Sequence, residues 1–166
     1  NNTSLIKQAK GNKQMVKLNQ SVPNFSLIST EGSSFQLSKL IGKKIVLYFY
    51  PKDSTPGCTT EGLQFSQLTG EFANLNTVIY GISRDSLKSH EKFRCKQDFK
   101  FHLLSDNEEL ACKLFDVIKE KNMYGKMVLG IERSTFLISD KGVLLTEWRK
   151  VKADGHAALV LQAIKD

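Results

Sequence analysis

Apolar and polar residues alternate along the chain in blocks whose spacing predicts strands and helices in turn. Residues 45–50 are continuously apolar or aromatic, and residues 77–83 form a second largely apolar run, so both predict buried strands. Between these runs, apolar residues recur at intervals of three and four positions, which predicts a single helix with an apolar face. These positions are Phe65, Leu68, Phe72 and Leu75.

The second half of the chain continues the alternation. It predicts helices over residues 87–96, 107–115 and 155–165, and strands over residues 101–104, 133–139 and 143–149. Residues 140–142 are a turn signal between the last two strands, and an earlier hairpin joins residues 26–29 to residues 34–37. A strand–helix–strand unit followed by a hairpin and a final helix predicts a thioredoxin-like α/β fold, in which helices flank a central mixed sheet.

Charge and length add limits to this picture. The 166 residues carry a formal net charge of +7, and residues 1–17 contain four lysines and no acid. We expect residues 1–17 to be a basic, mobile extension and residues 18–166 to be one domain. A solvated tail explains such an extension better than a binding site, so we expect no specific nucleic-acid partner.

The lengths of the apolar runs and the number of cysteines indicate the cellular location that we expect. No apolar run reaches the roughly 18 residues that a membrane-spanning helix needs, so we expect no membrane partner. Three cysteines without a visible secretion signal fit a reducing compartment, and we expect a cytoplasmic protein. The histidines His90, His102 and His156 lack ligand spacing, and we interpret all three as surface or capping residues. We therefore expect neither a metal nor another cofactor.

The chemistry concentrates in residues 51–58, a Pro- and Gly-containing loop that follows the first buried strand. It delivers Cys58 to the predicted start of a helix, where unpaired N–H groups and the helix dipole favour a thiolate. Thr55 lies three positions earlier in the same turn, where its hydroxyl could donate to the sulfur. A cysteine packed as a small apolar residue is the alternative interpretation.

Pro51, Thr55 and Cys58 match the Pro-x-x-x-Thr-x-x-Cys signature of the peroxiredoxins. Residues 23–27, 104–106 and 130–137 also resemble this family, in the expected order, and specifically its bacterioferritin comigratory protein (peroxiredoxin Q) subfamily. The resemblance implies a thiol-dependent peroxidase that reduces hydrogen peroxide and organic hydroperoxides through a cysteine sulfenic acid.

The same resemblance implies roles for individual residues. Cys58 would be the peroxidatic nucleophile, Thr55 would hydrogen-bond the sulfur and the peroxide, and Pro51 would shield the site from water. Arg133 matches the arginine that polarises the peroxide and holds the thiolate, and its always-charged guanidinium suits that role. A charge at the start of an apolar strand calls for an acidic partner, and Glu132 is a candidate.

How the sulfenic acid is recycled stays open. Many members of the subfamily carry a resolving cysteine five positions after the first, where this chain has Leu63. Cys95 fits the position used by other members, and Arg94 and Lys96 beside it favour a thiolate. Cys112 among apolar residues is a weaker candidate, and an external thiol is the third. A bond between Cys58 and Cys95 would require local unwinding, because disulfide geometry needs close Cα atoms.

The partners follow from the same reaction. We expect a hydroperoxide substrate, a reductant of the thioredoxin or glutaredoxin type, and a monomer. A general disulfide oxidoreductase is the main alternative, but the chain has no C-x-x-C pair. A non-catalytic thioredoxin-like binding module is a third reading, and it would not need Thr55, Cys58 and Arg133 together.

Overall fold

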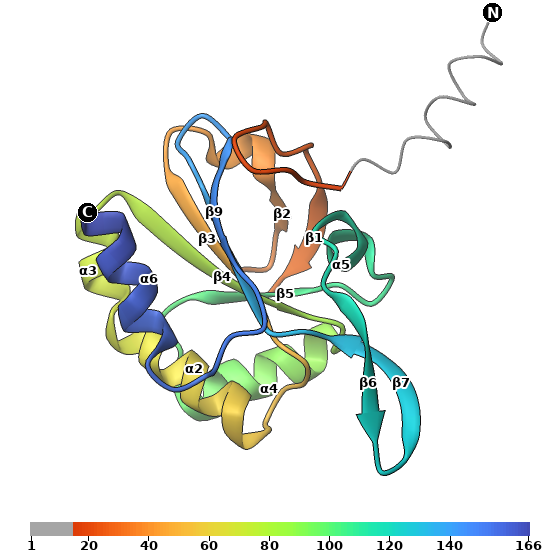
Figure 1. Ribbon diagram of the computed structural model, residues 1–166. Helices are drawn as coiled ribbons and strands as arrows, with labels where there is room; N and C mark the ends of the chain where they lie inside the picture. The colour runs from red at the N-terminus through yellow and green to blue at the C-terminus, as the bar shows by residue number, and fades with distance from the viewer. Residues whose placement is uncertain (1–14) are drawn as a thin grey trace, which may run out of the picture.

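The computed structural model describes residues 15–166 (Figure 1). Most of the expected basic extension, residues 1–14, therefore lies outside the described residues. Val16, at the end of that predicted extension, is half-buried, and its backbone N–H donates to the carbonyl of Leu114 at 3.0 Å.

A seven-stranded mixed sheet forms the centre of the molecule, in the order β2-β1-β5-β4-β3-β8-β9. The three central strands β3, β4 and β5 run parallel, while their neighbours pair antiparallel. The strands of this sheet are β1 (Ser26–Ser29), β2 (Ser34–Gln36), β3 (Lys44–Phe49), β4 (Thr77–Ser83), β5 (His102–Ser105), β8 (Ser134–Ile138) and β9 (Leu144–Trp148). The predicted mixed sheet and N-terminal hairpin are thus both present.

Both faces of the sheet are covered, because alternate residues of β3 point to opposite sides. Val46 and Tyr48 pack in one apolar cluster with side chains from four helices. These helices are α2 (Pro56–Gln67), α3 (Thr69–Asn74), α4 (Leu87–Gln97) and α6 (His156–Lys165). Leu47 and Phe49 pack in the other cluster, against the short helices η1 (Leu37–Leu40) and α5 (Leu110–Leu114) and the N-terminal segment. The two apolar layers hold β3 in place, and the loop that follows it starts from this buried strand.

The single helix predicted after the loop is broken in two at Leu68. Phe65 and Phe72 are fully buried on one continuous apolar face, so the predicted periodicity is correct. The Thr69 hydroxyl donates to the Phe65 carbonyl at 3.1 Å, however, and such a back-bond competes with the helix and bends it. The helix expected over residues 107–115 is shorter, because Glu109 adopts a left-handed conformation immediately before α5.

A two-stranded hairpin that the pattern did not predict projects from the body of the molecule (Figure 1). It consists of β6 (Ile118–Met123) and β7 (Lys126–Ile131). Tyr124 and Gly125 form its turn with positive φ angles of 55° and 84°, as expected of a tight two-residue hairpin turn. Most side chains of the hairpin are exposed, so neither strand shows the alternation that marks a half-buried strand.

Candidate active site

Cys58 lies in the first turn of α2, at the carboxyl end of β3. Thr55 is the extended N-cap residue, Pro56 opens the helix, and Cys58 is its third residue. Proline suits this place, because its fixed φ is helical and the first turn needs no N–H donor there. Only 2% of Cys58 is exposed, and the residue lies in the first helical turn, whose N–H groups have no partners within the helix. The predicted placement of the cysteine at a helix N-terminus is correct.

Arg133 is brought to this sulfur by strand pairing. β8 pairs with β3 so that Ser134 faces Phe49, which places the preceding Arg133 beside the loop. One guanidinium nitrogen, Nη2, lies 3.5 Å from Cys58 Sγ, although the residues are 75 positions apart. A Cβ atom on Gly57 would stand 3.1 Å from Nη2, so glycine here allows the guanidinium to approach closely.

Glu61 is the acidic partner of Arg133, in place of the Glu132 that the sequence suggested. Its Oε1 accepts from Arg133 Nη1 at 2.7 Å, and its side chain is fully buried. Burial raises the pKa of Glu61 from 4.5 to about 7, and the adjacent guanidinium opposes that rise. Burial also acts to lower the pKa of Arg133, but the negative charges of Glu61 and Cys58 outweigh it and raise the pKa.

Sequence reasoning missed this role of Glu61, although one signal was available. Glu61 follows Cys58 by three positions on the same helix, so both side chains lie on one face. A charged residue on the buried face of an amphipathic helix requires a partner of opposite charge. Glu61 therefore orients one edge of the Arg133 guanidinium and leaves the other edge for the sulfur.

Thr55 and Pro51 flank the same site. The Thr55 hydroxyl donates to the backbone carbonyl of Lys52 at 2.8 Å, and not to the sulfur as expected. Because the single hydroxyl proton is used in this way, the Thr55 oxygen can serve a further partner only as a hydrogen-bond acceptor. Pro51 is half-buried at the start of the loop.

The other two cysteines lie in very different surroundings. Cys95 is exposed on α4, in a shallow groove lined by Lys88, Glu91, Lys92 and Lys96. Arg94 points away from it, because its Nε donates to the Phe101 carbonyl at 2.8 Å. Cys112 is fully buried on α5, where burial and the Asp106 carboxylate raise its pKa well above the usual value. All three thiols are free.

Comparison with known proteins identifies the family. Residues 18–146 match the model of the AhpC/TSA family. The chain belongs to this family. It is 59% identical to peroxiredoxin Bcp of Xanthomonas campestris over 134 residues, covering 81% of this chain and 84% of that protein. It is 48% identical to peroxiredoxin Bcp of Bacillus subtilis over 151 residues, covering 91% of this chain and 96% of that protein.

Solved structures of the family share the fold. Peroxiredoxin Q of Xanthomonas campestris superposes with a TM-score of 0.84 at 52% identity, covering 93% of this chain and 98% of that chain. A variant of Xylella fastidiosa PrxQ superposes with a TM-score of 0.86 at 45% identity, covering 92% and 97%. The predicted thioredoxin-like fold and the peroxiredoxin resemblance are both confirmed, and the protein is an enzyme of the peroxidase type.

The cysteine spacing of this family member differs from that of one relative. Xanthomonas campestris peroxiredoxin Q has been solved with each of two cysteines replaced by serine, and those two cysteines stand 36 positions apart. Cys58 and Cys95 stand 37 positions apart.

Two histidines correct the interpretation made from the sequence. His90 and His156 are buried rather than at the surface. His156 Nε2 lies 2.8 Å from the Thr135 hydroxyl, and burial lowers its pKa to about 4. His90 forms with Asp53 and Asp85 a group whose potential metal-ligating atoms lie within 4.8 Å of one another. Hydrogen bonds already occupy these atoms, which favours a hydrogen-bond network over a metal site.

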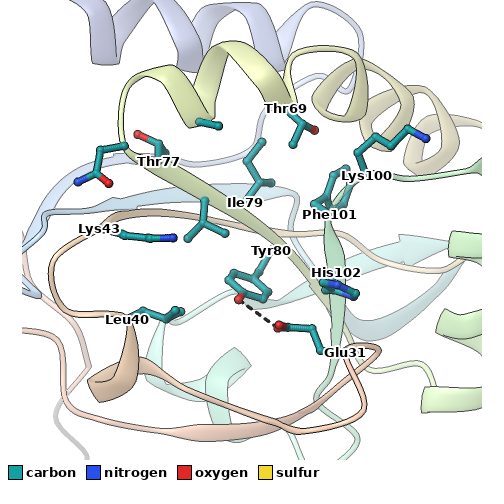
Figure 2. A pocket seen from close by; sticks show the side chains of 13 residues that line it. Glu31, Leu40, Lys43, Thr69, Thr77, Ile79, Tyr80, Lys100, Phe101 and His102 are labelled. Atoms are coloured by element: carbon teal, nitrogen blue, oxygen red, sulfur yellow. Dashed lines mark hydrogen bonds between the residues drawn. The ribbon is translucent and has the colours of Figure 1, made fainter.

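A cavity of about 410 Å³ lies at the opposite end of the parallel strands (Figure 2). Residues 77–80 at the start of β4 line it, together with Lys43 before β3 and His102 at the start of β5. The Tyr80 hydroxyl donates to Glu31 across it at 3.1 Å. Ligands of open α/β sheets usually bind at the carboxyl ends of the strands, and no cysteine lines this cavity at the other end.

Within residues 15–166, no helix is long and apolar enough to cross a membrane.

Proposed function

We propose that Cys58 is the peroxidatic cysteine of this peroxiredoxin and that Arg133 and Thr55 complete its active site. The observation that carries the proposal is the 3.5 Å approach of Arg133 Nη2 to a cysteine sulfur in the first turn of α2. A fixed guanidinium and free helix N–H groups both stabilise negative charge on that sulfur. The substrates are hydrogen peroxide and organic hydroperoxides.

The reaction uses groups that are already in place. The Cys58 thiolate attacks the terminal oxygen of the hydroperoxide, the O–O bond breaks, and the sulfur becomes a sulfenic acid. The departing alkoxide or hydroxide takes a proton and leaves as an alcohol or water. Arg133 stabilises the negative charge that moves from sulfur to the leaving oxygen. The Thr55 oxygen accepts a hydrogen bond from the attacked O–H group, because its own proton is held by the Lys52 carbonyl.

An organic substrate is supported by the relatives. A structure of Xanthomonas campestris bacterioferritin comigratory protein, 56% identical to this chain, was determined to explain alkyl peroxide reduction by that protein. Pro51 at the half-buried edge of the loop limits the access of water to the sulfur. We expect the same peroxide class to react here.

Recycling requires a thiol that reaches the Cys58 sulfenic acid. We propose Cys95 of the same chain, because it is exposed and three lysines surround it. Attack by the Cys95 thiolate on the sulfenic sulfur forms a disulfide and breaks the S–O bond, and the departing hydroxide takes a proton and leaves as water. A dithiol reductant of the thioredoxin or glutaredoxin type then reduces the disulfide. We propose that the protein acts in the cytoplasm, where such reductants operate, and that it acts as a monomer, since an intramolecular disulfide needs no second chain.

The first test is peroxide consumption by the Cys58→Ser variant in a stopped-flow experiment. We expect no turnover, because a hydroxyl without an adjacent base cannot replace a thiolate. Cys112→Ser is the matched control, since it removes an equally buried thiol on another helix and should keep the peroxide reaction. Turnover by Cys58→Ser near the wild-type rate would overturn the assignment.

The second test separates Cys95 from the other candidates for resolution. After one equivalent of peroxide, peptide mapping of the wild type should find an intramolecular Cys58–Cys95 bond. Cys95→Ser should keep the first peroxide reaction, accumulate sulfenic or sulfinic acid at Cys58 and lose turnover with a dithiol reductant. A Cys58–Cys112 bond, or a bond only between two chains, would contradict the role of Cys95 and leave the role of Cys58 intact.

A further inference from the structure

Three buried side chains and the half-buried Ser89 join the peroxidatic loop, residues 51–58, to the helix that carries Cys95. Asp53, in the middle of the loop, accepts hydrogen bonds from the Tyr50 hydroxyl at 2.6 Å and from the Ser89 hydroxyl at 2.8 Å. Its Oδ2 also lies 2.7 Å from His90 Nδ1. Asp53 and His90 have side-chain exposures of 3% and 0%, so water does not compete for these bonds. We call Tyr50, Asp53, Ser89 and His90 the loop latch.

The nearest group to each nitrogen of His90 is a hydrogen-bond acceptor; Nδ1 also lies 3.4 Å from the Tyr50 hydroxyl, whose proton is donated to Asp53. Nδ1 faces the Asp53 carboxylate, and Nε2 lies 2.9 Å from the backbone carbonyl of Leu104. Neutral imidazole has only one N–H, so both contacts are satisfied together by an imidazolium with a carboxylate, or by an equivalent sharing of the proton with Asp53. A charge-assisted bond of this kind is stronger than one between neutral groups.

The latch joins segments that are distant in the sequence. Asp53 lies five positions before Cys58, and His90 lies five positions before Cys95 on α4. The backbone N–H of Asp53 also donates to Asp85 Oδ2 at 3.0 Å, and Asp85 lies in the turn before α4. This is the third hydrogen bond from Asp53 to α4 or the turn that precedes it. The loop and the helix are therefore joined by hydrogen bonds five positions before each of the two cysteines.

Because Cys58 is buried, the hydrogen bonds between the loop and α4 affect how its sulfenic acid can react. With 2% of the residue exposed, a sulfenic acid on Cys58 is out of reach of any resolving thiol while the loop and the first turn of α2 keep their places. Resolution requires a local opening of the loop. The free energy of that opening includes the loss of every bond that holds the loop down.

We propose that the loop latch is a positioning device that keeps the peroxidatic loop closed and sets how often the Cys58 sulfenic acid emerges to meet a thiol. This inference rests on the proposed role of Cys58, but it requires no particular resolving thiol. The latch touches neither the peroxide nor the sulfur. It holds the site ready for the first reaction, slows the second, and so lengthens the interval in which a second peroxide could oxidise Cys58 further.

Hydrogen exchange of the reduced protein tests the latch without any use of peroxidase activity. Asp53→Asn keeps the shape of the side chain but removes the charge, so amides of residues 51–58 and of the first turn of α4 should exchange about 5- to 100-fold faster. Tyr50→Phe removes a single hydroxyl from the same latch and should change exchange in the same direction by less. Asp98→Asn is the matched control, because it removes an exposed carboxylate from the end of the same helix and should change nothing.

Two comparisons distinguish a latch from general destabilisation. Amides of β8 should exchange at the wild-type rate in all three variants, because β8 is outside the opening segment. In the double variant Asp53→Asn/His90→Gln, the effect should be no larger than in Asp53→Asn alone, since both substitutions break one unit. Equal acceleration over the whole protein, or unchanged exchange at residues 51–58, would overturn the proposal.

The peroxide reaction supplies the functional readout. With one equivalent of peroxide, Asp53→Asn should form the sulfenic acid at the wild-type rate, because the closed loop remains the majority conformation. The sulfenic acid should then disappear faster, and excess peroxide should yield less sulfinic acid than in the wild type. A wild-type sulfenic acid lifetime in a variant whose loop exchanges faster would refute the link to resolution, whereas failure of Cys58 to be oxidised at all would refute the proposed function.

Discussion

Cys58 and Cys112 occupy nearly identical local positions and differ in the charge that meets the sulfur. Each is the third residue of its helix, and their exposed fractions are 2% and 0%. Arg133 stands 3.5 Å from the Cys58 sulfur. Asp106 faces Cys112 and accepts a hydrogen bond from its backbone N–H at 2.7 Å. Burial and this carboxylate together raise the pKa of the Cys112 thiol. Burial alone makes a thiol inert, and a cation at the buried sulfur changes that outcome.

Helix length adds to the difference. α2 has 12 residues and α5 has five, so the dipole and the free N–H groups at Cys58 belong to a longer helix. The left-handed Glu109 before α5 also adds a second acid near Cys112. The two helix N-termini therefore differ in the sign of the side-chain charge nearest the sulfur, which is positive at Cys58 and negative at Cys112.

Removing the positive charge of Arg133 should have the largest effect on the difference between Cys58 and Cys112. Arg133→Met should slow the reaction of Cys58 with peroxide by about 10²- to 10³-fold, the usual cost of losing one preorganised donor to a developing charge. Stopped-flow measurement of sulfenic acid formation checks this.

Arg84→Met is the control, because Arg84 pairs with Glu109 near the other cysteine at 3.4 Å and should leave the rate unchanged. Equal rates in Arg133→Met and the wild type would remove Arg133 from the site.

Arg133 contacts both Glu61 and Cys58, so the titration of Glu61 gives a second prediction about the Cys58 site. The folded-state pKa of Glu61, about 7, lies above its ordinary value of 4.5. As the pH rises from 4.5 to 7, the unfolded chain loses this proton while the folded protein keeps it, so the free energy of unfolding falls. The fall should be about 3 kcal/mol and should level off above the folded-state pKa.

Denaturant unfolding of the wild type and of Glu61→Gln from pH 4 to pH 8 checks this prediction. The variant should lack the decline in that window, because its amide does not titrate. Parallel pH profiles for the two proteins would show that Glu61 does not titrate as described.

Cys112 carries the smallest expected effect. Cys112→Ser should lower the free energy of unfolding by about 1–3 kcal/mol, because a hydroxyl replaces an apolar thiol in a fully buried place. Its peroxide reaction should stay at the wild-type rate. In the native wild type, alkylation followed by mass spectrometry should label Cys95 readily and Cys112 only as fast as the protein opens. Rapid native labelling of Cys112 would contradict the contrast between the two buried sites.

Periodicity and turn signals predicted most of the sheet and the long helices. Those elements bury one or two faces, and burial leaves a period of two or of three to four residues in the sequence. The β6–β7 hairpin escaped prediction because it is largely exposed and has no such period. The break at Leu68 was missed for a different reason: a Thr69 side-chain bond interrupts the backbone without disturbing the apolar face.

The site was predicted only in part. The Pro- and Gly-containing loop marked Cys58, and the family signature marked Thr55 and Arg133. The pairing of Arg133 with Glu61 and the burial of His90 with Asp53 were not predicted. Each of these pairs joins segments that are far apart in sequence. A single polar residue in a sequence shows neither which partner it will have nor whether it will be buried.

By itself, the sequence determined the local conformation at Cys58: Pro56 and Gly57 start a helix there, and the apolar run of β3 fixes the strand that leads into it. Only the tertiary structure decided which charges surround each sulfur. The pairing of β3 with β8 carries Arg133 across 75 positions to Cys58, while the fold around α5 presents Asp106 to Cys112. Electrostatic interactions depend on distance and on exclusion of water, and packing sets both.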